Sequence, residues 1–195
     1  MTAAHIAQLV VYLGILLLAA KPLGSYMAAV YEGRRTFAHP VIQPLERSFY
    51  RIAGVDEDRE HGWKQYLVAV LGFNLLGFLL LYTLLRTQGH LPMNPESLPG
   101  LKPSLAFNTA VSFVTNTNWQ SYGGESTLSY LTQMLGLTVQ NFLSAATGMA
   151  VLIALARGFV QREANALGNF WVDMVRSTLY ILLPLSICLA VALSS

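Results

Sequence analysis

The sequence predicts an all-α integral membrane protein, and three observations support this fold class. The chain has 195 residues, of which 54% are hydrophobic and only 11% are charged, a composition too apolar for an ordinary soluble domain. The apolar residues are gathered into long runs instead of amphipathic stripes. Between two of these runs lies an uncharged polar stretch that fits neither a span nor a typical surface loop. The lipid bilayer is therefore the expected solvent.

Four segments are long and apolar enough to cross the roughly 30 Å hydrocarbon core, which takes about 20 helical residues. They are residues 5–30, 65–85, 129–156 and 177–193. The first 20 residues contain no Lys or Arg, whereas a cleaved secretory signal has positive charge before its apolar stretch. The first segment is therefore expected to be a transmembrane helix.

The distribution of cations predicts the orientation of these spans. Cations crowd the connector after the first span and the link after the third, which together contain Arg34, Arg35, Arg47, Arg51, Arg59, Arg157 and Arg162. Both links are expected in the cytoplasm. The connector over 86–130 has only Arg86 and Lys102, so it is expected outside, which also places the N-terminus outside.

The uncharged stretch lies in this outer connector and has two parts. Ser104 is an expected N-cap, and the ten residues after it would form a helix of about 15 Å, half the thickness of a membrane. Residues 115–121 are too polar to face lipid and precede the pair Gly123 and Gly124. A half-helix, a polar loop and a return to the same side describe a re-entrant pore loop, which is tolerated only where it is buried in protein or lines water. An ordinary extracellular loop with a short surface helix is the alternative interpretation.

Such a loop has a clear use for a cation. The C-terminal end of the half-helix is partly negative and would point toward the membrane centre. Loop carbonyls and Thr hydroxyls can then replace the hydration shell of the ion, as in potassium channels.

Several long motifs in this region and beyond it resemble one family. They are residues 108–122 (NTAVSFVTNTNWQSY), Gly124-Glu125 and residues 136–146 (GLTVQNFLSAA), with further likeness at 63–66, Asn94-Pro95, Gly168-Asn169 and 171–173. The chain resembles the potassium-binding and translocating A subunit of the bacterial Kdp potassium-transporting P-type ATPase. The resemblance covers essentially the whole sequence.

The resemblance implies a function, a site and partners. The first segment of the potassium filter would be Thr115, Asn116, Thr117 and Asn118, with Gln120 at its outer end. The function implied is potassium-selective binding and translocation in a high-affinity, ATP-driven uptake complex of the bacterial inner membrane. The subunit itself would be non-catalytic, with ATP hydrolysed by a separate B subunit and with C and F subunits completing the complex.

The resemblance also implies a domain organisation built from membrane-pore-membrane repeats. An extra N-terminal transmembrane helix (1–31) and a cytoplasmic connector (32–63) would precede the first repeat (64–159), whose pore loop spans 104–125. Residues 160–195 would form a cytoplasmic link and the first helix of a second repeat. A family A subunit contains four repeats, so this sequence resembles an N-terminal portion.

Polar residues within the spans have structural and functional interpretations. In the third span Gly136, Gln140, Ser144 and Gly148 recur every four residues, which favours tight helix packing, while Gln140 and Asn141 are candidate pore-lining residues. Asn74 is expected to bond to another helix. Asp173 and Arg176, near the start of the last span, are expected to pair at i, i+3 or to reach the membrane interface.

Other function classes lack the residues they need. The sequence has no basic block for nucleic acid, no phosphate-binding loop for ATP and no facing histidines within the spans for a metal or haem. No carboxylate lies near the centre of a span, as a proton-driven exchanger would require. The main alternative is a structural membrane scaffold whose polar loop holds a partner.

Overall fold

The computed structural model describes residues 2–160 and 166–194, and all regular structure in this part of the chain is helical. Four helical runs are long and apolar enough to cross a membrane: Ala4–Tyr31, Trp63–His90, Thr132–Val160 and Phe170–Ser194. The four predicted spans are therefore confirmed, although their ends differ. The predicted cytoplasmic cation Arg162 lies outside the described residues.

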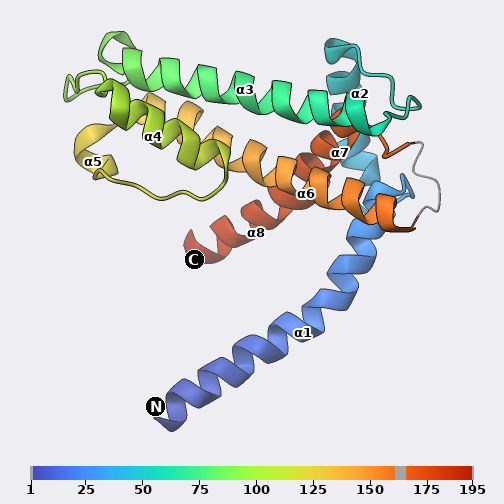
Figure 1. Cartoon of the computed structure of the whole chain (residues 1–195). Helices are drawn as coiled ribbons and strands as arrows, with labels where there is room; N and C mark the ends of the chain where they lie inside the picture. The colour runs from blue at the N-terminus through green and yellow to red at the C-terminus, as the bar shows by residue number, and fades with distance from the viewer. Residues whose placement is uncertain (1, 161–165, 195) are drawn as a thin grey trace.

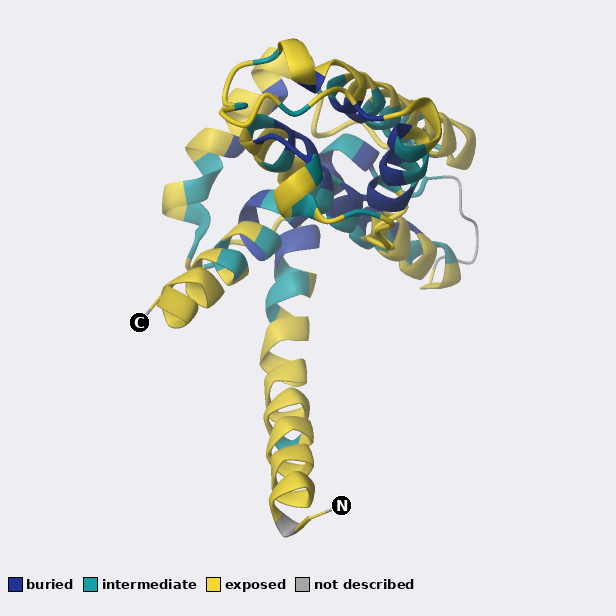
Figure 2. Ribbon diagram, turned by 90° about the vertical axis from the view of Figure 1, so that its left-hand side faces the viewer, coloured by how far each residue is buried: buried dark blue, intermediate teal, exposed yellow. Residues whose placement is uncertain are grey.

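The first span, α1, extends away from the remaining helices (Figure 1). Figure 2 shows its surface exposed along most of its length. Only its last turns pack against the body, where Val30 and Tyr31 are buried with residues of the fourth span. The helix runs from Ala3 to Tyr31. Because its exposed side chains are almost all apolar, this surface is suited to lipid or to other membrane helices.

The central unit consists of the second and third spans with a short helix between them. This short helix, α4, packs against both spans (Figure 1). Its Ala106, Ala110 and Phe113 are buried with Leu81 and Leu85 of α3. The elements are α3 (Trp63–Thr87), the 3₁₀ turn η1 (Gln88–His90), α4 (Pro103–Val114), α5 (Gly124–Thr127), the π-helical η2 (Thr132–Thr138) and α6 (Val139–Val160).

Small residues allow the second and third spans to approach closely. A Cβ atom on Gly136 would lie 2.9 Å from Leu84 and 3.0 Å from Leu81, and one on Gly77 would lie 3.0 Å from Oε1 of Gln140. The packing interpretation is therefore confirmed for Gly136 and Gln140, whereas a Cβ atom on Gly148 would meet nothing within 4 Å. Gln140 is buried in this contact, on the side of α6 that faces α3.

The fourth span begins at Phe170, seven residues before the predicted start at 177. The sequence suggested a later start because Asp173 and Arg176 are charged, but both are paired with residues of other elements. The span consists of α7 (Phe170–Arg176), the π-helical η3 (Ser177–Leu182) and α8 (Leu183–Ser194). The remaining helix, α2 (His39–Ala53), contacts α7 and η3.

Two local predictions were wrong. Pro103, and not Ser104, begins α4, because proline is favoured in the first helical position, where its missing N–H group costs nothing. Asn74 does not bond to another helix. Its Nδ2 donates to the Val70 carbonyl oxygen at 2.8 Å, one turn back in its own helix.

Candidate ion-binding loop

The candidate site begins at the C-terminal end of α4, a helix of 12 residues and therefore about 18 Å long. Its Thr109, Ser112 and Phe113 are buried, which fixes the helix between the second and third spans. The last carbonyls of a helix have no partner within the helix and carry partial negative charge. The segment Thr115 to Asn118, here called the TNTN loop, follows directly on this end.

The backbone of the TNTN loop folds back onto the end of α4. The N–H groups of Thr115 and Asn116 donate to Val111 and Phe113 at 3.0 and 3.3 Å. Those of Thr117 and Asn118 both donate to the Ser112 carbonyl oxygen, at 3.0 and 3.2 Å. Asn116 and Asn118 have φ angles of 56° and 54°, a left-handed conformation that asparagine tolerates better than most residues.

This arrangement leaves the loop carbonyls without partners. The carbonyl oxygens of all four TNTN residues accept no hydrogen bond from residues 2–160 or 166–194. The next carbonyl, that of Trp119, is held by the Ser112 hydroxyl at 2.8 Å. Since every N–H group in the loop is satisfied by the helix end, what the loop presents is a set of uncharged oxygen acceptors.

The side chains of the TNTN loop add further oxygens. The hydroxyls of Thr115 and Thr117 lie 3.0 Å apart. The Ser144 hydroxyl of α6, which is 2.8 Å from the Gln140 carbonyl oxygen, also lies 3.3 Å from Oδ1 of Asn116, so the loop contacts the third span here. All four loop residues are exposed. The sequence reasoning assigned Ser144 only to packing, so this contact was missed.

The structure separates the other predicted site residues from this group. Gln120 is exposed and makes no hydrogen bond to the described residues. Gln140 packs against Gly77. Asn141 has a buried Oδ1 atom without a hydrogen-bond partner in the described chain, and such an atom usually finds a partner in a complete native structure.

Gln88 holds the two ends of the loop excursion together, and the sequence reasoning missed it. Its Nε2 donates to the Pro99 and Thr127 carbonyl oxygens, both at 2.8 Å. Its Oε1 accepts from the Ser129 N–H at 3.2 Å. The chain therefore leaves for α4 and returns after α5 at the same place, beside the end of α3. The sequence does not reveal this role, because all three partners of Gln88 are backbone groups, which nearly any residue type provides.

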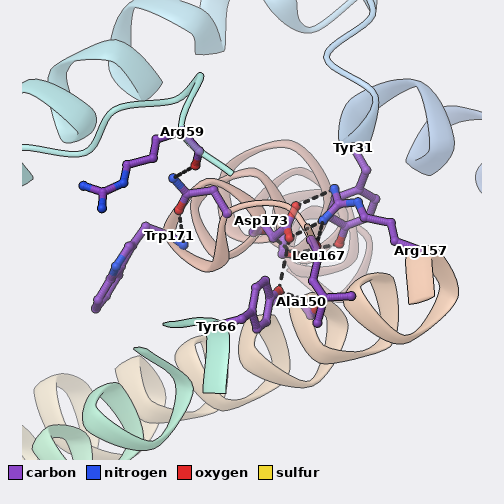
Figure 3. Close-up of polar contacts among 10 residues, drawn as sticks. Tyr31, Arg59, Tyr66, Ala150, Arg157, Leu167, Trp171 and Asp173 are labelled. Carbon is purple, nitrogen blue, oxygen red and sulfur yellow. Dashed lines mark hydrogen bonds and ion pairs between the residues drawn. The ribbon is translucent and has the colours of Figure 1, made fainter. Parts of the chain in front are cut away.

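A second polar cluster lies where α3 and α7 begin and α6 ends (Figure 3). Arg157 donates to both carboxylate oxygens of Asp173, at 2.6 and 2.8 Å. The Tyr66 hydroxyl lies 3.1 Å from Oδ2 of Asp173 and 2.8 Å from the Ala150 carbonyl oxygen. Asp173 is only 1% exposed. The predicted pairing of Asp173 with Arg176 was wrong, because Arg157 of another helix is the partner.

Arg176 instead pairs with Glu46 of α2, with 3.0 Å between Nε and Oε1. The hydroxyls of Tyr50 and Tyr180 also donate to this carboxylate, each at 2.7 Å. Burial alone would raise the pKa of Glu46, but the hydrogen bonds from Tyr50, Tyr180 and Arg176 bring that pKa below its usual value. The carboxylate is therefore ionised at neutral pH and anchors α2 to the fourth span.

The fold and the loop together define a class of protein: a multi-span helical membrane protein with an uncharged polar loop at the end of a short, buried helix. Comparison with known proteins then identifies the family. The family model for the potassium-transporting ATPase A subunit matches residues 10–195. The chain belongs to this family.

Individual relatives support the same assignment. The chain is similar to proteins named potassium-transporting ATPase potassium-binding subunit, with 63% identity over 193 residues in Methylococcus capsulatus and 62% over 195 residues in Sorangium cellulosum. The protein of that name from Rhodospirillum centenum is 62% identical over 186 residues. These matches cover 99%, 100% and 95% of this chain, respectively, but only 32–34% of the relatives. The chain thus spans about a third of their length. These relatives are named as the potassium-binding subunit of the ATPase and not as its catalytic subunit.

Proposed function

We propose that the chain provides one part of a potassium-selective filter in a high-affinity, ATP-driven uptake complex. The observation that carries this proposal is the set of unpaired carbonyl oxygens in the TNTN loop, at the C-terminal end of α4. Carbonyl and hydroxyl oxygens can replace the hydration shell of potassium, and the helix end adds a favourable potential for a cation. Potassium is the substrate here, taken up from the outer face.

We further propose that residues 104–125 form a re-entrant pore loop within a repeat spanning 64–159. Gln88 supports this, because it joins the start and the end of the excursion at one end of α3. Non-helical backbone at membrane depth must be covered by protein or line water. One loop supplies only one side of an ion's coordination shell, so the filter requires further loops around it. In this arrangement Gln120 lies at the outer end of the filter and Asn141 lines the pore.

The proposed complex follows from the family. The relatives are named as subunits of a potassium-transporting ATPase. We propose that a separate B subunit hydrolyses ATP, that C and F subunits complete the assembly, and that the complex lies in the bacterial inner membrane. The N-terminus is then outside the cell.

Replacing Asn118 distinguishes a backbone filter from a scaffold loop. Asn118→Gly keeps the left-handed backbone, so potassium uptake by the assembled full-length subunit should keep its half-saturation concentration. Asn118→Val strains that backbone by about 1–2 kcal/mol, or roughly 5- to 30-fold in ion affinity, so the half-saturation concentration should rise by up to a factor of that order.

Ser97→Val is the matched control, because Ser97 has a φ of 52° in an exposed turn away from the loop. It should leave the half-saturation concentration unchanged. If Asn118→Val also leaves it unchanged at normal expression, the loop is not the filter and the scaffold interpretation is favoured.

A further inference from the structure

Helix α2 has three distinct faces, only one of which packs on the rest of the chain. The packed face contains Ile42, Glu46 and Tyr50, spaced four residues apart, with Glu46 paired to Arg176 and Ile42 in contact with the cluster around Tyr180. A helix that only connected two spans through water would be expected to have polar residues over the rest of its surface. The remaining two faces of α2 are nevertheless sharply different from each other.

The second face of α2 is apolar and exposed. Val41, Leu45, Phe49 and Ile52 are 81%, 47%, 48% and 86% exposed. Their spacing of four, four and three residues places them along one side of the helix. This set is here called the α2 stripe. Four large apolar side chains in a continuous row are a surface that soluble proteins rarely leave in water.

The third face of α2 is cationic. Arg47 and Arg51 are one turn apart and both exposed, and neither forms an ion pair with the described residues. At 100° per residue, the α2 stripe lies along one edge of the packed face, and the two arginines lie along its other edge. A helix packed along one side, apolar on a second and cationic on the third is suited to the boundary between lipid tails and headgroups.

Aromatic contacts place α2 beside the spans instead of beyond their ends. The ring of Phe37, just before α2, stacks on Tyr26 with 5.2 Å between centroids. Tyr26 lies five residues before the end of α1, or about 7.5 Å along the helix. His39, the first residue of α2, lies 5.6 Å from the ring of Tyr180 in the fourth span. Figure 1 shows α2 crossing the direction of α3 near the end where α3 begins.

We propose that α2 is an interfacial helix that docks on an anionic phospholipid leaflet. The α2 stripe enters the boundary of the acyl chains, and Arg47 and Arg51 bind the phosphate groups of the same leaflet. An amphipathic helix in this position buries its apolar face about 5–10 Å below the headgroups, which matches the depth of the contact with Tyr26. Anionic lipid is favoured over a protein partner because two exposed arginines without ion-pair partners accompany the apolar stripe, and headgroup phosphates attract such cations. The connector 32–63 is then partly a membrane element.

Spin labels on the assembled full-length complex in phosphatidylglycerol-containing vesicles test this docking. In a background with Cys188→Ser and no other cysteine, labels are placed by Val41→Cys, Ile52→Cys and Arg47→Cys. Collision with molecular oxygen is compared with collision with a water-soluble nickel chelate. Leu17→Cys in the exposed part of α1 is the hydrocarbon reference, and Asp58→Cys is the aqueous reference.

Positions 41 and 52 should give oxygen-to-nickel ratios well above that of position 58 and toward that of position 17, and position 47 should give a ratio between that of position 58 and those of positions 41 and 52. Labels at 41 and 52 that behave like position 58 would show that the stripe faces water. Labels at 41 and 52 that meet neither reagent would show that a protein covers the stripe. Either of these results overturns the proposal. All three labelled positions are exposed, so the labels should not disturb the fold.

The role of the arginines is tested with the label at position 41. Arg47→Gln with Arg51→Gln should lower its oxygen-to-nickel ratio severalfold in phosphatidylglycerol vesicles and change it little in phosphatidylcholine vesicles. Arg59→Gln, an exposed arginine in the same connector, is the control and should change neither. Equal effects of the double substitution in both lipids would overturn the anionic-lipid assignment.

Discussion

At the scale of single residues, polar side chains inside this apolar fold mainly form hydrogen bonds that join backbone segments distant in the sequence. Gln88 is fully buried, and its side chain forms hydrogen bonds with two backbone carbonyl groups and one backbone N–H group. Asn94 works beside it, with hydrogen bonds to the Leu98 backbone in both directions. Buried backbone groups without hydrogen-bond partners are destabilising. These amides supply such partners and so stabilise the non-helical turn between α3 and α4.

Removing the Gln88 side chain should therefore destabilise the excursion that contains the TNTN loop. Gln88→Leu leaves the buried Ser129 N–H and two partly buried carbonyl groups unpaired. A buried unpaired group costs about 1–3 kcal/mol, so the assembled complex should unfold at a lower temperature. Gln65→Leu is the control, because Gln65 is exposed at the start of α3. Thermal unfolding in detergent should separate the two variants. Equal stability would mean that the amide does not hold the loop ends.

The Arg157–Asp173 pair should behave as a buried ion pair. Only 2% of the Asp173 side chain and 24% of the Arg157 side chain are exposed. Removing one partner of such a pair costs on the order of 3–5 kcal/mol, because the other charge is left without compensation. Asp173→Asn and Arg157→Met should each lower the unfolding temperature strongly, and the double variant should lose less than the sum.

The exposed pair Arg34–Glu32 provides the control for this cycle. Its side chains are 61% and 60% exposed, and exposed pairs contribute little. Arg34→Met should leave the unfolding temperature nearly unchanged. Strict additivity of the two substitutions at positions 157 and 173 would show that the pair has no coupling energy.

At the scale of elements, the turn before α4 is built on very close backbone packing. The Leu101 N–H donates to the Leu85 carbonyl oxygen at 3.0 Å, and Arg86 donates to the Leu101 carbonyl oxygen. Gly100 lies in this contact, and a Cβ atom there would overlap the Arg86 carbonyl oxygen. The backbone of the turn thus lies directly against the end of α3, which sets the position where α4 starts.

Gly100→Ala should consequently shift or destabilise α4. Overpacking against backbone, which cannot move aside like a flexible side chain, costs about 1–3 kcal/mol. Gly72→Ala is the matched control, because Gly72 lies on α3 with nothing within 4 Å of a new Cβ atom. Thermal stability of the full-length complex should fall for position 100 only. A loss of similar size at position 72 would assign the effect to alanine in general.

The elements that could be predicted from the sequence are those with a local signal. The spans were found because length and apolarity are properties of a continuous segment, and the half-helix because charge is absent over a long stretch. The contact between Gln88 and Thr127 was not predictable, because it joins residues 39 positions apart through a backbone group. The amphipathic character of α2 was also overlooked, since its apolar and cationic side chains cancel in the average composition.

The sequence predicts which residues form the candidate site but not their geometry. The sequence indicated that Thr and Asn residues follow a half-helix, and the motif carried the family resemblance. It did not indicate that Asn116 and Asn118 adopt left-handed backbone, nor that the loop N–H groups turn back to the helix end. Both features depend on contacts that form only in the folded chain, between the loop and the last carbonyl groups of α4 and between the loop and Ser144.

At the scale of the whole molecule, the helices have two chemically different ends. One end has α5 and the turn between α3 and α4, and the other has α2 and the start of α7 (Figure 1). The Arg157–Asp173 and Arg176–Glu46 pairs both lie at the second end. Cations concentrated at one end of a set of spans mark the cytoplasmic side. We therefore propose that the second end faces the cytoplasm and that the TNTN loop is reached from the opposite side.

Cysteine labelling of the full-length subunit in its assembled complex tests this orientation. In a background with Cys188→Ser and no other cysteine, Glu96→Cys should react with a membrane-impermeant maleimide added to intact cells, because Glu96 is exposed in the turn at the first end. Asp58→Cys, exposed in the connector at the second end, should react only after the membrane is opened, since cation-rich connectors are retained in the cytoplasm. Thr2→Cys should behave like position 96, because a single span separates the N-terminus from the connector. Labelling of position 58 in intact cells, with position 96 protected, would reverse the topology and place the TNTN loop on the cytoplasmic side, where it could not receive potassium from outside.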